Sequence, residues 1–324
     1  MSAPRLLHPL VDSRRDDPLP DVAVVGAIGD TPLLPLRSLA RSMGLPERIE
    51  LWLKCEWTNP GGSIKDRPAL GIVRAAFASG DLGGGKVLLD ATSGNTGIAY
   101  AMLGAALGFQ VELVVPGSAS EERKRLLAAY GATVTYSDSY DGSNGAIRLA
   151  SEMALNGVER YFYADQYSNP ANPSAHAAST GPEIWRQTRG ALTHFVAGLG
   201  TSGTMMGTGG YLKERDSTIQ LVGVQPSEAF HGIEGIKHLA SELVPAIYDS
   251  SVTDCQVNIE SEKAFEMVRW LARKEGLFVG ISTGAALVAA LRVGTELAER
   301  EQCGRIVVIA PDGGGKYLSG GAWH

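Results

Sequence analysis

Short apolar segments alternate with helix-like stretches along most of this 324-residue chain, and this alternation restricts the fold more than any other feature. The segments are rich in Val, Ile and Leu, which is typical of parallel strands buried on both faces. Strands that alternate with helices predict an α/β protein with open, mostly parallel sheets covered by helices. We expect the strands at residues 51–54, 87–90, 110–115, 133–136, 194–197, 219–224 and 305–310.

Three helices can be located by their spacing or their ends. Residues 68–78 carry apolar side chains at helical spacing. Ser120 precedes two acidic residues, which predicts a serine cap followed by an acidic first turn. Residues 261–275 also show helical spacing and stop before Gly276, a residue type that commonly ends helices.

The composition is that of an ordinary globular protein. Apolar residues make up 44% of the chain and charged residues 20%, and the length favours two domains. A net charge of -6 gives no electrostatic reason to expect nucleic-acid binding. Three cysteines without a C-x-x-C pair or a metal-ligand spacing predict a reducing, cytoplasmic compartment and no metal site. We see no signal peptide and no apolar run of membrane-spanning length, so no membrane association is expected.

The loop after the first strand holds a lysine. Residues 58–67 read Thr-Asn-Pro-Gly-Gly-Ser-Ile-Lys-Asp-Arg, so Lys65 follows a sharp glycine-rich bend and is expected at the start of a helix. A helix N-terminus disfavours the ammonium form and lowers the pKa of a lysine. A lysine with a lowered pKa suits Schiff-base chemistry and proton abstraction.

The loop at residues 92–97 reads Thr-Ser-Gly-Asn-Thr-Gly and opens an apolar helix. Its hydroxyls and backbone N–H groups predict an anion cradle suited to a substrate carboxylate. The alternative is an ordinary capping turn, because Ser, Thr, Asn and Gly all favour turns.

Residues 198–204 form a third loop, Gly-Leu-Gly-Thr-Ser-Gly-Thr, that is suited to a phosphate group. Gly198, Gly200 and Gly203 also match G-x-G-x-x-G, a pattern of dinucleotide-binding proteins. That pattern requires an acidic residue after the next strand. The next strand here ends in Gln225 and Pro226, which favours a phosphate monoester.

A fourth loop, residues 280–285, also precedes an apolar helix and places Ser282 near its start. A serine hydroxyl could hydrogen-bond a pyridine nitrogen and leave that nitrogen largely unprotonated. The resulting weaker electron sink favours β-elimination over transamination.

These loops resemble the signature of fold-type II pyridoxal-phosphate enzymes, and the chain is similar to B-type cysteine synthases (O-acetylserine sulfhydrylases) from about residue 28 to 320. Asp30 stands where asparagine is usual in the opening motif of that family. The motifs that carry the resemblance lie at residues 28–33, 165–173, 180–185, 222–226, 232–236 and 316–319.

The resemblance implies a role for individual positions. Lys65 would form the Schiff base with pyridoxal 5'-phosphate and act as the general base. The cofactor would be bound by Lys65, Asn95, Gly200, Thr201, Ser202, Gly203, Thr204 and Ser282. The amino-acid carboxylate would be bound by Thr92, Ser93, Thr96 and Gln166, and Gly235 would line the substrate cleft.

The implied reaction is a two-stage β-replacement in which an activated serine loses its leaving group and a sulfur nucleophile adds to form cysteine. Ser227 stands where some phosphoserine-using relatives carry arginine, which favours O-acetylserine as the donor. Pro311 and Asp312 occupy the place where the thiosulfate-accepting type has cysteine, so sulfide, thiosulfate and a carrier-protein thiocarboxylate all stay open as sulfur donors. Alternatives are cystathionine or diaminopropionate formation, or a binding protein on a catalytically retired fold.

The resemblance also implies a tryptophan synthase β-like architecture of two domains. Residues 1–47 would be a lead-in that packs on the larger domain. Residues 48–160 would form the smaller domain with Lys65 and the substrate loop, and 161–324 the larger, phosphate-binding domain. A homodimer in the cytoplasm is expected, and a small sulfur-carrier protein is a conceivable partner.

Overall fold

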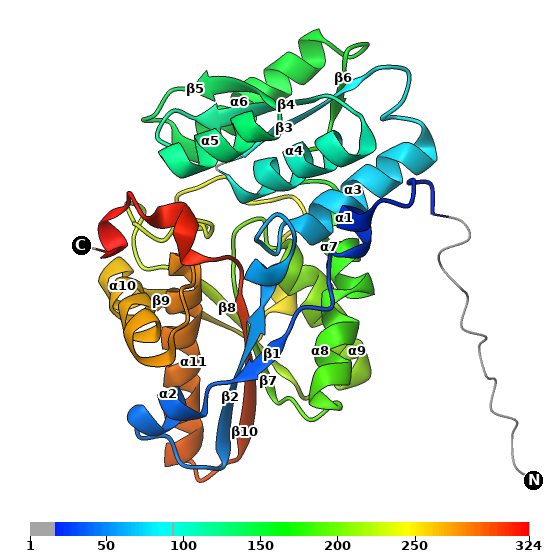
Figure 1. The fold of residues 1–324 in the computed structure, drawn as a ribbon. Helices are drawn as coiled ribbons and strands as arrows, with labels where there is room; N and C mark the ends of the chain where they lie inside the picture. The colour runs from blue at the N-terminus through cyan, green and yellow to red at the C-terminus, as the bar shows by residue number, and fades with distance from the viewer. Residues whose placement is uncertain (1–16, 93, 324) are drawn as a thin grey trace, which may run out of the picture.

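The computed structural model describes residues 17–92 and 94–323, which form two sheets covered by helices (Figure 1). The larger sheet has the strand order β1-β2-β10-β7-β8-β9 and the smaller one β5-β4-β3-β6. Neighbouring strands are parallel except for β1 and β2. The predicted α/β class with two mostly parallel sheets is thereby confirmed.

The larger sheet combines strands from the N-terminal part and the C-terminal half of the chain. Its strands are β1 (Leu33–Pro35), β2 (Ile49–Cys55), β7 (His194–Gly198), β8 (Gln220–Pro226), β9 (Cys255–Ile259) and β10 (Gly304–Ala310). Helices α2 (Arg37–Ser42), α10 (Ser261–Trp270) and α11 (Ile281–Glu299) share a core with one face. The other face packs on α8 (Thr180–Thr188) and α9 (Gly210–Arg215), with α7 (Ala171–Ala178) beside them.

The smaller sheet has a helical layer on each face, because its buried strands alternate their side chains between two cores. Leu88 lies in the core with α4, and Leu89 in the core with α6. The strands are β3 (Val87–Ala91), β4 (Val111–Pro116), β5 (Thr133–Ser137) and β6 (Tyr161–Tyr163). The helices are α1 (Ala23–Gly26), α3 (Asp66–Ser79), α4 (Asn95–Leu107), α5 (Glu121–Ala129) and α6 (Gly142–Asn156).

The sheet composition differs from the predicted domain boundaries. Strand β2 falls in the range predicted for the smaller domain, but it pairs with β1 and β10 of the larger sheet. Strand β6 begins at Tyr161, in the range predicted for the larger domain, but it pairs with β3 of the smaller sheet. Within the lead-in, Leu19 and Val25 pack in the core of the smaller sheet, whereas β1 and Leu39 pack on the larger sheet as predicted. Strand pairing between distant segments is decided by tertiary packing, which local composition does not record.

Two local expectations hold with a modification. Ser120 is the residue before α5, and two acidic residues follow it as predicted, but its hydroxyl donates to the carbonyl of Lys316 instead of capping the helix. The helix predicted at 261–275 is present and ends at Gly276, although its last turn, Leu271–Glu275, is π-helical. Unlike the other three loops, the one at 280–285 follows an isolated bridge between Val279 and Gly313.

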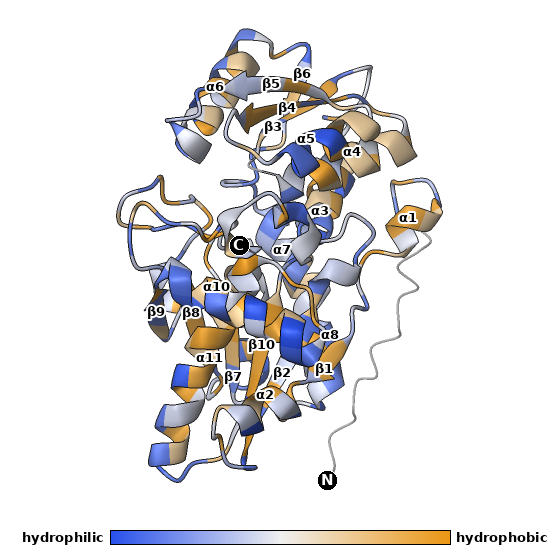
Figure 2. Ribbon diagram, turned by 60° about the vertical axis from the view of Figure 1, so that its left-hand side comes forward, coloured by the Kyte–Doolittle hydropathy of each residue, from blue (hydrophilic) through white to orange (hydrophobic). Residues whose placement is uncertain are grey.

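Helix α11 has the length and the apolar composition that a membrane-spanning helix needs. This differs from our expectation that the chain has no apolar run of membrane-spanning length. The helix packs against β10 and β7 of the larger sheet, and 67% of its most apolar 18-residue window is buried inside the protein (Figure 2). Its apolar character is therefore that of a core helix.

Candidate active site

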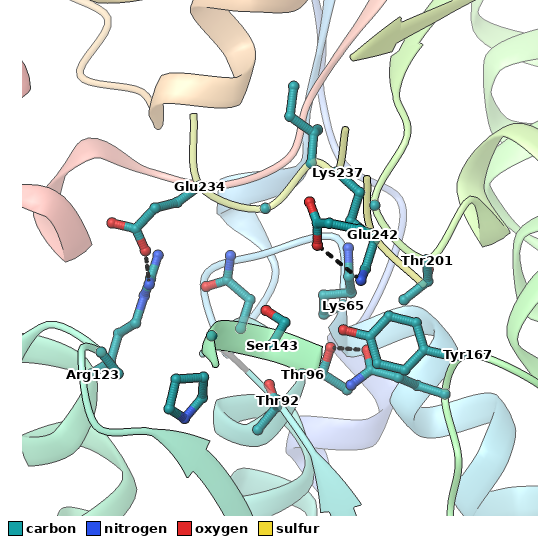
Figure 3. A pocket seen from close by; sticks show the side chains of 18 of the residues that line it. Lys65, Thr92, Thr96, Arg123, Ser143, Tyr167, Thr201, Glu234, Lys237 and Glu242 are labelled. Carbon is teal, nitrogen blue, oxygen red and sulfur yellow. Dashed lines mark hydrogen bonds and ion pairs between the residues drawn. The ribbon is translucent and has the colours of Figure 1, made fainter. Parts of the chain in front are cut away.

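The predicted site residues meet in one cleft between the two sheets. A cavity of about 330 Å³ is lined by Lys65, Thr92, Asn95, Thr96, Gln166, Gly200, Thr201 and Gly235, among others (Figure 3). A narrower recess shares Lys65, Asn95, Gly200, Thr201 and Gly235 with this cavity and adds Ser202, Thr204 and Ser282. Gly203 lies within the same loop but lines neither space, and Ser93 lies outside the described residues.

Lys65 is the residue directly before α3, and its side chain reaches into the cavity (Figure 3). Burial lowers the pKa of its amine, the positive charge of Lys316 lowers it further, and Asp312 opposes the shift. The direction agrees with the sequence-based expectation, but desolvation rather than the helix terminus is the main cause. The neutral amine that nucleophilic and base chemistry needs is therefore favoured.

Lys316 connects the bend before Lys65 to Asn95. Its Nζ donates to the carbonyls of Gly61 and Gly62, both at 3.1 Å, and to Oδ1 of Asn95 at 2.8 Å. The Nδ2 of Asn95 donates in turn to Asp312 at 2.7 Å. These contacts fix the orientation of the Asn95 amide at the edge of the recess.

A buried ion cluster lies beneath the same bend. Arg67 contacts Glu56 and Glu183, each at 2.7 Å, and Lys54 contacts Glu183 at 2.7 Å. Although burial opposes it, Arg67 and Lys54 hold the pKa of Glu183 at about 2. Since each buried charge has an opposite partner, the cluster ties the start of α3 to α8 and β2.

The loop after β7 presents donors toward the recess. Within the described residues, the amides of Gly200, Thr201 and Ser202 donate no hydrogen bond. Asn172 Nδ2 donates to Thr201 Oγ1 at 3.2 Å, so the hydroxyl proton of Thr201 is free for another acceptor. Ser202 has φ 67, a left-handed conformation that is strained for a residue with a side chain. Strained backbone with free amides is a common arrangement in anion-binding loops.

Helix α7 approaches this loop so closely that position 203 has no room for a side chain. A Cβ on Gly203 would lie 1.9 Å from Asn172 Oδ1, which is itself buried without a hydrogen-bond partner. His176, also on α7, places its Nε2 3.3 Å from Thr204 Oγ1. Burial lowers the pKa of His176 far below its ordinary range, so the ring is neutral. The supporting residues on α7 therefore hold the loop hydroxyls without adding charge.

Two hydroxyls of the loop at 92–97, those of Thr92 and Thr96, are used within the protein. Thr92 Oγ1 accepts from the amides of Gly94 at 3.0 Å and Gly97 at 3.2 Å. Thr96 donates to Gln166 Oε1 at 2.7 Å. Thr92 therefore caps the start of α4, which agrees with the alternative of an ordinary capping turn. Thr92 and Thr96 nevertheless also line the cavity.

The sequence did not reveal the charged wall of the cavity. Arg123 forms an ion pair with Glu234, and Lys237 lies 3.1 Å from Glu242. Of these four residues, only Glu234 lies in one of the motifs that carry the family resemblance. The partner of Arg123 lies over a hundred residues away in the chain, so no local pattern could reveal this pair. The position of Lys237 two residues after Gly235 was the one available signal.

The residues present fit a phosphorylated pyridine aldehyde. The free amides after β7 suit the phosphate, and the amine of Lys65 suits the aldehyde. Ser282 lines the same recess, and within the described residues its hydroxyl has no hydrogen-bond partner and is available to a ring nitrogen.

Comparisons with known proteins agree with this chemistry. The family model for pyridoxal-phosphate dependent enzymes matches residues 24–312. The chain is 49% identical over 296 residues to a cysteine synthase of Aquifex aeolicus, covering 91% of this chain and 90% of the relative. It is 42% identical to cysteine synthase B of Escherichia coli, with 91% and 94% covered.

Two solved structures extend the comparison. A cysteine synthase of Entamoeba histolytica superposes with a TM-score of 0.87 at 32% identity, covering 100% of this chain and 93% of the other. An O-ureido-L-serine synthase gives a TM-score of 0.84 at 37% identity, with 94% and 96% covered.

Proposed function

The chain belongs to the family of pyridoxal-phosphate-dependent enzymes, within its cysteine synthase group, and from this premise we propose that it makes L-cysteine from O-acetylserine and a sulfur donor. The cofactor, the enzyme class and the formation of cysteine follow from membership. The choice of donor and the roles of individual residues are our proposal. Its main support is that the lysine loop, the substrate loop, the phosphate loop and Ser282 all border one cleft.

Each side of the cleft has a distinct task in this proposal. Gly200, Thr201, Ser202, Gly203 and Thr204 would hold the phosphate, Asn95 the ring hydroxyl and Ser282 the ring nitrogen. When bound, pyridoxal phosphate supplies an electron sink that stabilises negative charge at the α-carbon of an amino acid.

The amino acid itself would be held by the smaller sheet. Thr92, Ser93, Thr96 and Gln166 would bind its carboxylate at the N-terminus of α4, and Gly235 would line the opposite wall. The neutral amine of Lys65 would then take the proton from the α-carbon, which allows the β-substituent to leave. Closing the smaller sheet over the cleft would exclude water while the sulfur donor adds.

Borohydride reduction of the cofactor-loaded protein, followed by peptide mass spectrometry, tests the role of Lys65 without measuring turnover. We expect the cofactor to be attached to Lys65 and the Lys65→Ala protein to carry no such attachment. Lys316 is the internal control, because it lies near the recess but hydrogen-bonds Asn95 and the Gly61–Gly62 bend. Attachment at Lys316, or full turnover by Lys65→Ala, would contradict the proposal.

A second candidate keeps the cofactor and changes the nucleophile. The similarity to an O-ureido-L-serine synthase supports considering an oxygen or nitrogen nucleophile instead of sulfur. Competing sulfide against such nucleophiles in one reaction and measuring the products would separate the candidates. Cysteine as the main product supports the first.

We also propose that the protein acts as a cytoplasmic homodimer that uses small-molecule substrates. Light scattering after size-exclusion chromatography would measure the mass directly. A mass near 34 kDa, that of one chain, would contradict the dimer.

A further inference from the structure

Two ion pairs line the cavity on opposite sides (Figure 3). Arg123 of α5 pairs with Glu234 on one side. Lys237 Nζ lies 3.1 Å from Glu242 Oε2 on the other. All four side chains line the same cavity as Lys65. Arg123 and Lys237, the cations of these two pairs, are therefore already neutralised by carboxylates of the protein.

The Lys237–Glu242 pair is held in place on several sides. Lys237 has a side chain only 6% exposed, and its Nζ lies 5.1 Å from the centre of the Tyr167 ring. Glu242 also accepts from the amide of His238 at 3.1 Å. Although burial opposes it, His231 and Lys237 hold the pKa of Glu242 below its ordinary value. Glu242 is thus negative at neutral pH and cancels the charge of Lys237.

Given the proposed function, a donor amino acid would direct its β-substituent toward the wall that carries Lys237 and Glu242. The carboxylate would occupy the Thr96–Gln166 side and the α-carbon would face Lys65, and the remaining wall carries the two ion pairs together with uncharged residues such as Pro116, Ser118 and Ala119. Tyr167, beneath Lys237, directly follows Gln166 in the chain. The leaving group and the Lys237–Glu242 pair are therefore neighbours in the cavity.

We propose that Glu242 selects for donors with an uncharged leaving group by neutralising Lys237. A phosphate leaving group carries up to two negative charges and would have to displace Glu242 from Lys237 while facing its repulsion. An acyl ester carries no charge, so it is not repelled by Glu242 and does not have to displace Glu242 from Lys237. The inference rests on the proposed function and assigns its donor preference to a specific carboxylate.

We do not expect the Arg123–Glu234 pair to select between donors in this way. Its guanidinium lies 4.8 Å from the centre of the Tyr317 ring. A Cβ on Gly94 would lie 2.5 Å from Arg123 Cδ, so the arginine is packed against the substrate loop. We therefore assign selection to the Lys237 side.

The test compares kcat/KM for O-phosphoserine with kcat/KM for O-acetylserine in variants of the cofactor-loaded enzyme. Glu242→Gln should raise this ratio roughly tenfold, because it frees Lys237 for the phosphate. Glu228→Gln is the matched control, since it removes the same charge from an exposed position on the same segment, outside the cavity. It should leave the ratio unchanged. If Glu242→Gln does not fold, Glu242→Ser removes the same charge.

Two further variants locate the effect. The double variant Lys237→Met with Glu242→Gln should lose the gain, and Glu234→Gln should not reproduce it. An unchanged ratio in Glu242→Gln, a gain that survives without Lys237, or an equal gain in Glu234→Gln would each overturn the inference. Wild-type protein without turnover on O-acetylserine would instead reject the proposed function, so the two failures are distinguishable.

Discussion

The two sides of the cleft differ in how their polar groups are used. On the side proposed for the phosphate, the amides of Gly200, Thr201 and Ser202 donate to nothing within the described residues. On the side proposed for the carboxylate, Thr92 caps its own turn, and Thr96 is hydrogen-bonded to Gln166. The hydroxyl of Thr96 would therefore have to exchange its bond to Gln166 for one to a substrate, whereas the three amides need no such exchange.

This difference has a physical consequence. Free amides at a fixed loop require no rearrangement to bind an anion, so they favour tight binding. Hydrogen bonds that must be broken first reduce net affinity, because the exchange leaves little net gain. Permanent cofactor binding and weaker, reversible substrate binding are therefore consistent with the same cleft.

The largest effect is expected from Gly203→Ala. The new Cβ would lie 1.9 Å from Asn172 Oδ1, so the Asn172 side chain, which donates to Thr201, or the loop itself must move, and the loop loses its support. Cofactor affinity, measured by absorbance titration of the apoprotein, should fall on the order of a hundredfold. Gly210→Ala is the control, because a Cβ at this first residue of α9 would have no atom within 4 Å. An equal loss of cofactor affinity in both variants would show that the geometry of this loop is not the cause.

The next effect concerns pH, at a residue beneath the carboxylate side. Burial raises the pKa of Asp90 to about 8, whereas the unfolded value is near 3.9. Between these values the unfolded chain loses the proton that the folded protein retains, so stability falls as pH rises from about 4 to 8. Asp90→Asn resembles the protonated form. It should reduce the loss of unfolding free energy between pH 5 and pH 6.5 by about 2 kcal/mol.

Urea unfolding at the two pH values measures this change. The control is Asp21→Asn, at an exposed position in the chain before α1, which should keep the wild-type dependence. A wild-type-like dependence in Asp90→Asn would mean that the buried carboxyl does not carry the effect.

Thr96→Val separates the two sides of the cleft most clearly. It removes the hydroxyl that donates to Gln166 at 2.7 Å and preserves the shape of the side chain. KM for the donor amino acid should rise about tenfold, a loss of ~1.4 kcal/mol, while cofactor affinity stays at the wild-type value. A parallel fall in cofactor affinity would show that the two sides act as one unit.

The smallest effect is expected at Asp30, on neither side of the cleft. Asp30 has φ 44 and an exposed ion pair with Arg186 at 2.6 Å. Asparagine tolerates this backbone conformation at least as well, and exposed pairs contribute little. Asp30→Asn should change the unfolding free energy by less than about 0.5 kcal/mol, as judged by urea unfolding. A loss above about 1 kcal/mol would contradict this.

The residues proposed to react could be identified from the sequence because each lies in a short loop dense in polar residues. Lys65 follows a glycine-rich bend, and the hydroxyls at 201–204 directly follow β7, so local order alone brings their chemistry together. The sheet order could not be read in the same way. Strand β2 pairs with β10, about 250 residues later, and no local pattern records such a pairing.

The supporting residues were hidden for a related reason. Asn172 contacts Thr201, and Lys237 lies over the ring of Tyr167; both partners are distant in sequence, and each residue looks unremarkable among its own neighbours. The cause of the lowered pKa of Lys65 was also misjudged, because burial depends on how the two sheets close around the amine.

The visible absorption spectrum of the cofactor-loaded protein tests the central claim most directly. We predict an absorption band that is lost in Lys65→Ala and that shifts on addition of O-acetylserine at lower concentrations than with O-phosphoserine. A band that neither compound moves would contradict the proposed cysteine synthase reaction. A band that persists in Lys65→Ala would contradict the role of Lys65 itself.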